Sequence, residues 1–226
     1  MSFTDKTWAI PVILAFMTLL ASVLLSFSEH ATRERIEQQK RAILLRSLHT
    51  IVTPDAHDND LLASAQPVYA PQALGHRQPE TFYRGTKNGK LTLVILPVVA
   101  RQGYSGDIRL LVAIDADDGK ILGTKILEHH ETPGLGDLIE PEKSPWLKQF
   151  AGKSLRDPVP RLWKVRKDGG AFDQITGATI TPRAVIRALK NALEYAKQRM
   201  PEWRQLPTRQ QKTDTMQQTQ ANSSHE

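Results

Sequence analysis

The clearest periodicity in the chain lies near its carboxyl end. From Pro182 to about Gln198, apolar residues recur every three or four positions, as on a helix with one buried face. The apolar positions are Val185, Ala188, Leu189, Ala192, Leu193 and Ala196. We expect Met200-Pro201 to end this helix, because proline lacks the N–H that the next turn needs.

The middle of the chain alternates in the manner of strands. The predicted strands are Thr81 to Arg84, Leu91 to Val99, Arg109 to Asp115, Lys120 to Leu127 and Leu162 to Val165. Asn88-Gly89 and Asp118-Gly119 should close two hairpins, since both pairs adopt positive φ at low cost. Pro145 to Phe150 is predicted as a short helix. Consecutive strands with peripheral helices indicate an α+β domain with a mainly antiparallel sheet.

An uncharged run of twenty residues, Trp8 to Phe27, stands near the start of the chain. At 1.5 Å per residue a helix of this length matches the bilayer core of roughly 30 Å, which predicts an N-terminal transmembrane anchor. A cleaved signal peptide is the alternative, with Lys6 as its basic start and Ser26-x-Ser28 as its cleavage site. The run exceeds the usual apolar stretch of about 7–15 residues, which favours the anchor.

These patterns divide the chain into four parts. Residues 1–28 form the predicted anchor, and 29–79 a stalk helix, Thr32 to Leu48, with an irregular lead-in. Residues 80–203 form the folded domain. Residues 204–226 are dominated by Gln, Thr, Ser and Lys, which bury too little apolar surface to order a chain, so we expect a disordered tail.

Composition excludes several functions. The chain has no cysteine, which removes disulfides, thiolate catalysis and cysteine-ligated iron–sulfur clusters. Its net charge of +6 does not gather into a basic face with interleaved aromatic residues, so we expect no nucleic-acid partner. Nucleophile elbows, Walker loops and zinc-protease helices are also missing from the sequence.

The first candidate motif is Asp173-Gln-Ile-Thr-Gly-Ala-Thr-Ile-Thr-Pro182. Its final pair, Thr181-Pro182, suits a helix start, with threonine as the N-cap and proline in the first turn. An ordinary cap would account for that pair alone. A helix start also offers unpaired amides to a phosphate, so the same residues suit an anion site.

The second candidate motif is the segment from His129 to Asp137, with glycine at positions 134 and 136. Glycines let backbone approach a flat ring, and the amides can bond its polar edge. A dinucleotide fingerprint is disfavoured because Ile139 replaces its third glycine. Metal binding by His129, His130 and Glu131 is also disfavoured, since adjacent side chains on an extended segment point in opposite directions. A structural or surface role for the histidines is favoured.

Both motifs, together with the loop Gly103 to Ile108 and the segment Lys164 to Gly170, resemble the FMN-binding domain of the G subunit of Rnf electron-transport complexes. The C subunit of sodium-pumping NADH:quinone reductases is the near alternative. The resemblance implies FMN held covalently by a phosphoester on Thr181 and attached by a separate flavin transferase. It also implies cofactor contacts from Asp173, Thr176, Gly177, Ala178, Thr179, Glu131, Thr132, Gly134, Leu135 and Gly136.

Three further roles follow from the resemblance. Asp173 would help the transferase recognise the motif or polarise the Thr181 hydroxyl, and Arg183 would be a charge partner for the phosphate. Trp146 and Phe150 match aromatic positions of the family, although both are explained equally well as core residues.

The function implied is electron carriage by one subunit of a membrane complex that couples electron transfer between ferredoxin and NAD to ion translocation. Other subunits would be its partners, and the chain would not be a complete enzyme alone. The family places its flavin domain on the periplasmic face of the bacterial inner membrane. The positive-inside count argues the reverse, with one lysine before the span and Arg33, Arg35, Lys40 and Arg41 after it. A membrane-anchored assembly protein without a cofactor is the rival from another class.

Overall fold

The computed structural model describes residues 12–20, 22 and 44–206, and the chain divides into two compact units, Met1–Leu44 and Leu45–Glu226. In the first unit, residues 12–20 and 22 are helical and exposed. No helix within the described ranges is both long and apolar enough to cross a membrane. The predicted span, Trp8 to Phe27, extends past those ranges at both ends. Most of the predicted stalk and tail also lies outside them.

The second unit is built on a five-stranded sheet in the order β1-β2-β3-β4-β5, with every neighbouring pair antiparallel. The strands are β1 Gln66–Val68, β2 Glu80–Lys87, β3 Lys90–Ala100, β4 Ile108–Asp115 and β5 Ile121–Glu128. Asn88 and Gly89 join β2 to β3 with φ of 52° and 74°, the two positive values of a type I′ turn. The predicted antiparallel sheet and both predicted hairpins are confirmed.

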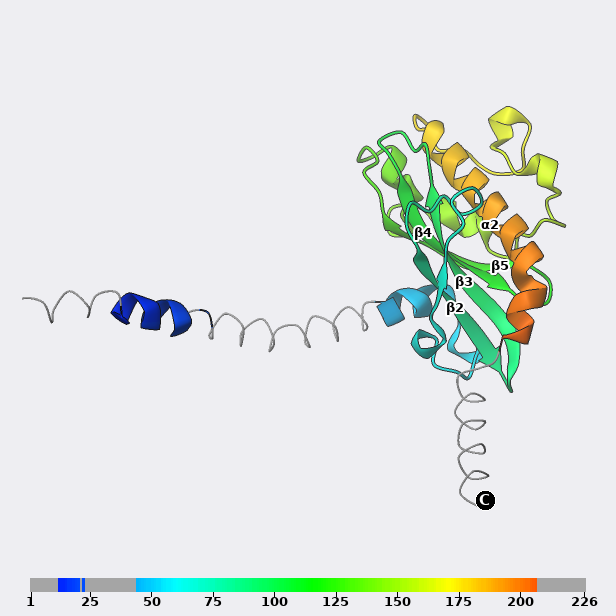
Figure 1. Ribbon diagram of the computed structural model, residues 1–226. Coiled ribbons are helices and arrows are strands. Elements are labelled where there is room, and N and C mark those ends of the chain that lie inside the picture. Colours follow the sequence, from blue (N-terminus) through cyan, green and yellow to red (C-terminus); the bar gives the residue numbers. More distant parts are fainter. Residues whose placement is uncertain (1–11, 21, 23–43, 207–226) are drawn as a thin grey trace, which may run out of the picture. The chain divides into compact units, whose positions relative to one another are not determined.

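Helix α2, Ile180–Gln205, lies across one face of the sheet (Figure 1). All of its predicted inward residues are buried, and they share one apolar cluster with Val94, Leu96 and Val98 of β3. Successive side chains of a strand point to opposite faces, and Leu93 and Ile95 are also fully buried. The sheet is therefore covered on both faces.

The segment before β2 packs against the sheet. Residues 45–51 are helical, and an added Cβ at Gly123 of β5 would lie 2.4 Å from the Ile51 carbonyl oxygen. Two short 3₁₀ helices, Pro54–Ala56 and Leu62–Ser64, lead to β1. The compact unit that contains the sheet begins at Leu45.

The predicted start of α2 is wrong by about half a turn. Thr179, not Thr181, is the N-cap, and it makes no side-chain capping bond. Thr181 is the second helical residue, and its hydroxyl is used elsewhere. Pro182 therefore occupies the third position, where it removes one of the unpaired amide donors of the first turn.

The predicted end of α2 is also wrong, because the helix continues through Pro201 to Gln205. Tertiary contacts outweigh the hydrogen bond lost at proline. Trp203 packs on Phe82 with ring centroids 5.1 Å apart, and buried Arg84 donates from Nη1 to the Trp203 and Leu206 carbonyl oxygens at 3.1 and 3.0 Å. These bonds satisfy carbonyls at the helix end that have no partner within the helix.

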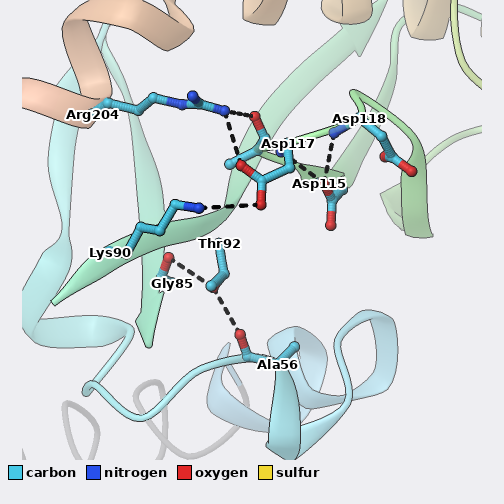
Figure 2. A network of polar contacts seen from close by, with 9 residues as sticks. Ala56, Gly85, Lys90, Thr92, Asp115, Asp117, Asp118 and Arg204 are labelled. Carbon is cyan, nitrogen blue, oxygen red and sulfur yellow. Dashed lines mark hydrogen bonds and ion pairs between the residues drawn. The ribbon is translucent and has the colours of Figure 1, made fainter. Parts of the chain in front are cut away.

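A second contact holds the same helix end to the β4–β5 connection (Figure 2). Arg204 Nη2 donates to the Ala116 carbonyl oxygen at 2.5 Å and to Asp117 Oδ1 at 3.1 Å. Asp115 Oδ1 accepts the backbone N–H groups of Asp117 and Asp118, which fixes the turn that Arg204 contacts. Strand β2 and the β4–β5 connection are thereby tied to one helix end.

The expected strand Leu162 to Val165 is not formed. Short 3₁₀ helices, Pro160–Leu162 and Arg166–Asp168, flank the position, and Val165 makes only an isolated bridge to Phe172. The apolar residues there fill the core, since Trp163 and Val165 are almost fully buried. The short helix at Pro145–Phe150 is confirmed as 3₁₀, and another 3₁₀ helix spans Gly136–Ile139.

Candidate functional site

Three loops and the first turn of α2 enclose a pocket of about 410 Å³. This volume lies within the range of roughly 300–1,000 Å³ that small-molecule sites occupy. The lining residues are Tyr104, Glu131, Thr132, Leu135, Gly136, Gly177, Ala178, Thr179, Ile180 and Thr181. The fold therefore brings the two candidate motifs, which are far apart in sequence, to the same cavity.

Thr181 and Glu131 form the closed end of this pocket. Thr181 is fully buried and Glu131 is 5% exposed, whereas Tyr104, Leu135 and Ile180 are exposed at the mouth. The Thr181 hydroxyl donates to Glu131 Oε2 at 2.5 Å. A buried carboxylate needs hydrogen-bond donors to offset its lost hydration, and this hydroxyl is one of them.

The other contacts of Glu131 fix its orientation. Its Oε1 accepts the Ser105 backbone N–H at 3.1 Å, and its own backbone N–H donates to His129 Nδ1 at 3.0 Å. His129 Nε2 donates in turn to Glu140 Oε1 at 2.6 Å. Because Nδ1 acts as an acceptor, the imidazole proton must be on Nε2. His129 has a structural role, as favoured from the sequence.

Two glycines are needed where the loops approach each other. A Cβ at Gly136 would lie 2.6 Å from Glu131 Oε2 and 3.0 Å from Thr181 Oγ1, so a side chain there would separate this pair. Gly177 has φ of +80°, and its added Cβ would lie 2.8 Å from Leu135. Larger residues at either position would fill the pocket.

Several predicted site residues lie elsewhere. Asp173 and Thr176 line a second pocket of about 400 Å³ together with Trp146, and Gly134 lines neither pocket. Asp173 Oδ1 pairs with Arg166 Nε at 3.0 Å, and its backbone oxygen accepts the Trp146 indole N–H at 2.6 Å. The carboxylate on the Thr181 hydroxyl is thus that of Glu131.

Arg183, the predicted partner of a phosphate, already has a carboxylate partner. Its Nε and Nη2 donate to the two oxygens of Asp168 at 2.6 Å each. The Arg183 guanidinium lowers the pKa of the Asp168 carboxyl by hydrogen bonding and by its charge. A phosphate on Thr181 would have to compete with this fork-like pair for Arg183.

Three residues of the site were not predicted from the sequence. Tyr104 and Ile180 line the pocket, and the Ser105 amide holds Glu131. The loop Gly103 to Ile108 could have indicated two of them, Tyr104 and Ser105, because it resembles a segment of the family. No cofactor contact was predicted for this loop. Within the described part of the chain, no group of His, Asp or Glu residues could hold a metal ion.

An ion cluster next to the Glu131 loop is formed by Lys143, Asp137 and Glu140. Lys143 Nζ lies 2.9 Å from Asp137 Oδ2 and 2.8 Å from Glu140 Oε1. Hydrogen bonding to Lys143 and its charge lower the pKa of both carboxyls, and His129 adds to the effect on Glu140. The same contacts raise the pKa of the Lys143 ammonium.

The ion cluster predicts how stability depends on pH. Depressed carboxyl pKa values add stability that is present above the ordinary carboxyl pKa, near 4, and is lost as pH falls through the lowered values. The raised Lys143 pKa adds stability that is lost only above about pH 10. We therefore expect Lys143→Met to be less stable than wild type at pH 7, with the difference shrinking toward pH 3.

Urea unfolding of both proteins across that range measures the difference. Lys197→Met, which changes an exposed lysine of α2, serves as the control and should stay parallel to wild type. A Lys143→Met difference that is constant with pH would contradict the assignment.

Comparison with known proteins identifies the family of this chain. It is 42% identical over 187 residues to the G subunit of the ion-translocating oxidoreductase complex of Vibrio atlanticus, covering 83% of this chain and 88% of that protein. It is 44% identical over 184 residues to the protein of the same name from Pseudomonas aeruginosa, covering 81% and 86%. This chain belongs to the G-subunit family of ion-translocating oxidoreductase complexes. The resemblance to that family is confirmed.

In this member of the G-subunit family, residues 103–194 match the family model of the FMN-binding domain. That range contains every residue lining the 410 Å³ pocket. The crystal structure of Shewanella oneidensis NqrC is also similar, at 26% identity over 64% of this chain and 74% of that chain, with a TM-score of 0.45.

Proposed function

We propose that this chain is the electron-carrying flavoprotein subunit of an ion-translocating oxidoreductase complex. Its FMN is joined through the phosphate to Thr181 Oγ1. The observation that carries the proposal is the Thr181 hydroxyl at the closed end of a pocket bounded by both motifs. The similarity to G subunits of ion-translocating oxidoreductase complexes supports membership of such a complex. The match to the FMN-binding domain supports FMN as the cofactor.

The residues present suit such a cofactor. FMN bound in this way supplies reversible one- and two-electron chemistry. Thr181 offers the hydroxyl for a phosphoester, and the exposed apolar side chains of Leu135, Ile180 and Tyr104 suit the surface of a flat ring. Gly136 and Gly177 leave room for close approach. Of the first three helical positions only Ile180 and Thr181 carry amide N–H groups, so few first-turn amides are available to the phosphate.

A single N-terminal anchor in the bacterial inner membrane completes the proposal, with residues 1–28 as anchor, 29–79 as stalk and lead-in, 80–203 as flavin domain and 204–226 as a polar tail. Residues 12–20 and 22 support it, because they are helical and expose Ile13, Phe16 and Leu19. The flavin domain is placed on the periplasmic side. Partner subunits exchange electrons between ferredoxin and NAD and move the ion, and a flavin transferase attaches FMN from FAD.

Peptide mapping tests the attachment. The full-length protein, co-produced with a flavin transferase, should gain the mass of one FMN less one water. Fragmentation of the modified peptide should place this addition on Thr181 and not on Thr176 or Thr179. An unmodified protein under these conditions, or an addition on either other threonine, would refute the proposal and favour a cofactor-free assembly role or another attachment site.

A further inference from the structure

The proposed attachment needs a group that takes the proton from Thr181. A threonine hydroxyl is a weak nucleophile at neutral pH, and such nucleophiles are activated by an adjacent base within hydrogen-bond reach. Among the described residues, the only side chain bonded to Thr181 Oγ1 is Glu131, whose Oε2 lies 2.5 Å away. The two oxygens are thus within the hydrogen-bond reach that a general base needs to take a proton.

We propose that Glu131 of this chain is the general base for its own modification, a proposal that rests on the proposed function. Thr181 Oγ1 attacks the flavin-side phosphorus of a flavin dinucleotide supplied by the transferase. The bond from Oγ1 to phosphorus forms, and the bond from that phosphorus to the bridging pyrophosphate oxygen breaks. AMP leaves, and the hydroxyl proton passes to Glu131 Oε2. No electron is gained or lost.

The surroundings of Glu131 keep one carboxylate oxygen for this task. Its Oε1 is occupied by the Ser105 N–H, so Oε2 is the atom that faces the hydroxyl. The bond from the Glu131 backbone to His129, and from His129 to Glu140, fixes the loop that carries the carboxylate. A base that is already held in position avoids the entropic cost of positioning it during the reaction.

The rival carboxylates are engaged in exposed ion pairs. Asp173, 59% exposed, pairs with Arg166, and Asp168 pairs with Arg183. Neither is bonded to Thr181. A carboxylate that is 5% exposed and touches the reacting oxygen is therefore the better placed base. Thr181 also lines the pocket, which leaves an approach for the phosphorus from the open side.

Glutamine at position 131 separates a base from a structural partner. Its amide oxygen can accept either the Thr181 hydroxyl or the Ser105 N–H, but not both, and it cannot take the proton. The melting temperature of the variant is therefore measured beside its rate. Purified full-length protein, transferase, FAD and a divalent cation are mixed, and intact mass is followed over time. We expect Glu131→Gln to slow FMN attachment about 10²–10⁴-fold, the usual contribution of a general base. The transferase concentration giving half-maximal rate should not change.

Glu128→Gln is the matched control, since Glu128 is an exposed carboxylate at the end of β5 that does not line the 410 Å³ pocket. It should gain FMN at the wild-type rate. Attachment to Glu131→Gln within a few-fold of wild type would overturn the role of Glu131 and leave the proposed function intact. If wild type itself gains no FMN, the proposed function fails.

If Glu131→Gln melts at a lower temperature than wild type, a second variant, Glu131→Ala, tests whether Glu131 acts as the base. Glu131→Ala removes the carboxylate and leaves space beside Thr181 for a small acid. Formate should then restore part of the rate in Glu131→Ala and have no effect on wild type. Attachment to Glu131→Ala that is slow and unchanged by formate, or fast without formate, would count against the base.

Discussion

Thr181→Val should abolish covalent flavin attachment completely while leaving the domain folded. Valine has nearly the shape of threonine, so the buried space at the start of α2 stays filled. The variant lacks the only atom at this position that could carry a phosphoester. Intact mass after co-production with the transferase should show only unmodified protein, and in-gel fluorescence under denaturing conditions should be absent.

The same substitution removes the donor to Glu131 Oε2. Leaving a buried acceptor without its donor costs about 1–3 kcal/mol, so a lower melting temperature accompanies the loss of flavin. Thr181→Ser keeps a hydroxyl and should still be modified. Thr124→Val, a half-buried threonine on β5 that lines neither pocket, should be modified as wild type is. Covalent FMN on Thr181→Val would refute attachment at this residue.

Phe150→Ala should destabilise the domain by about 3–5 kcal/mol, more than the loss of the Thr181 hydroxyl. Phe150 is fully buried and joins three other rings: its centroid lies 5.2 Å from Trp146, 6.4 Å from Trp163 and 4.8 Å from Phe172. Removing the ring leaves a cavity among rigid neighbours that cannot close around it. Natural domains are stable by roughly 5–15 kcal/mol, so a large share would be lost.

Urea unfolding followed by tryptophan fluorescence measures this cost, because Trp146 and Trp163 adjoin the cavity. Tyr69→Ala is the control, since Tyr69 is an aromatic residue with 57% exposure and should change stability by no more than about 0.5 kcal/mol. Equal effects of the two substitutions would show that the four rings do not form a cooperative core. That core carries the backbone of Asp173 through Trp146.

Local signals in the sequence were sufficient for strands β2 to β5 and for the inward face of α2. They were not sufficient for β1, which lies in the segment predicted to be an irregular lead-in. Asn88-Gly89 specifies a two-residue turn by its backbone preferences, and Leu189 and Leu193 specify a buried helix stripe by spacing alone. The pocket was found through motif resemblance, because no periodicity relates Glu131 to Gly177. The tertiary fold brings these segments together.

The errors share one physical cause, which is that distant contacts decided local structure. Pro201 should end a helix, yet Arg84 and Trp203 hold the next turn in place. Thr181 should cap a helix, yet its hydroxyl bonds to a glutamate fifty residues earlier, a partner that no local pattern reveals. The Thr181–Glu131 contact is also the one that gives the site its proposed chemistry.

Arg84 and Arg204 fasten the carboxyl-terminal end of α2 to β2 and to the β4–β5 connection, although helix ends ordinarily fray. Rotation or sliding of the whole helix would break these bonds. If FMN is joined to Thr181 as proposed, we therefore expect α2 to keep its position. We expect any change in shape to occur in the loops around Tyr104, Glu131 and Gly177, which line the pocket.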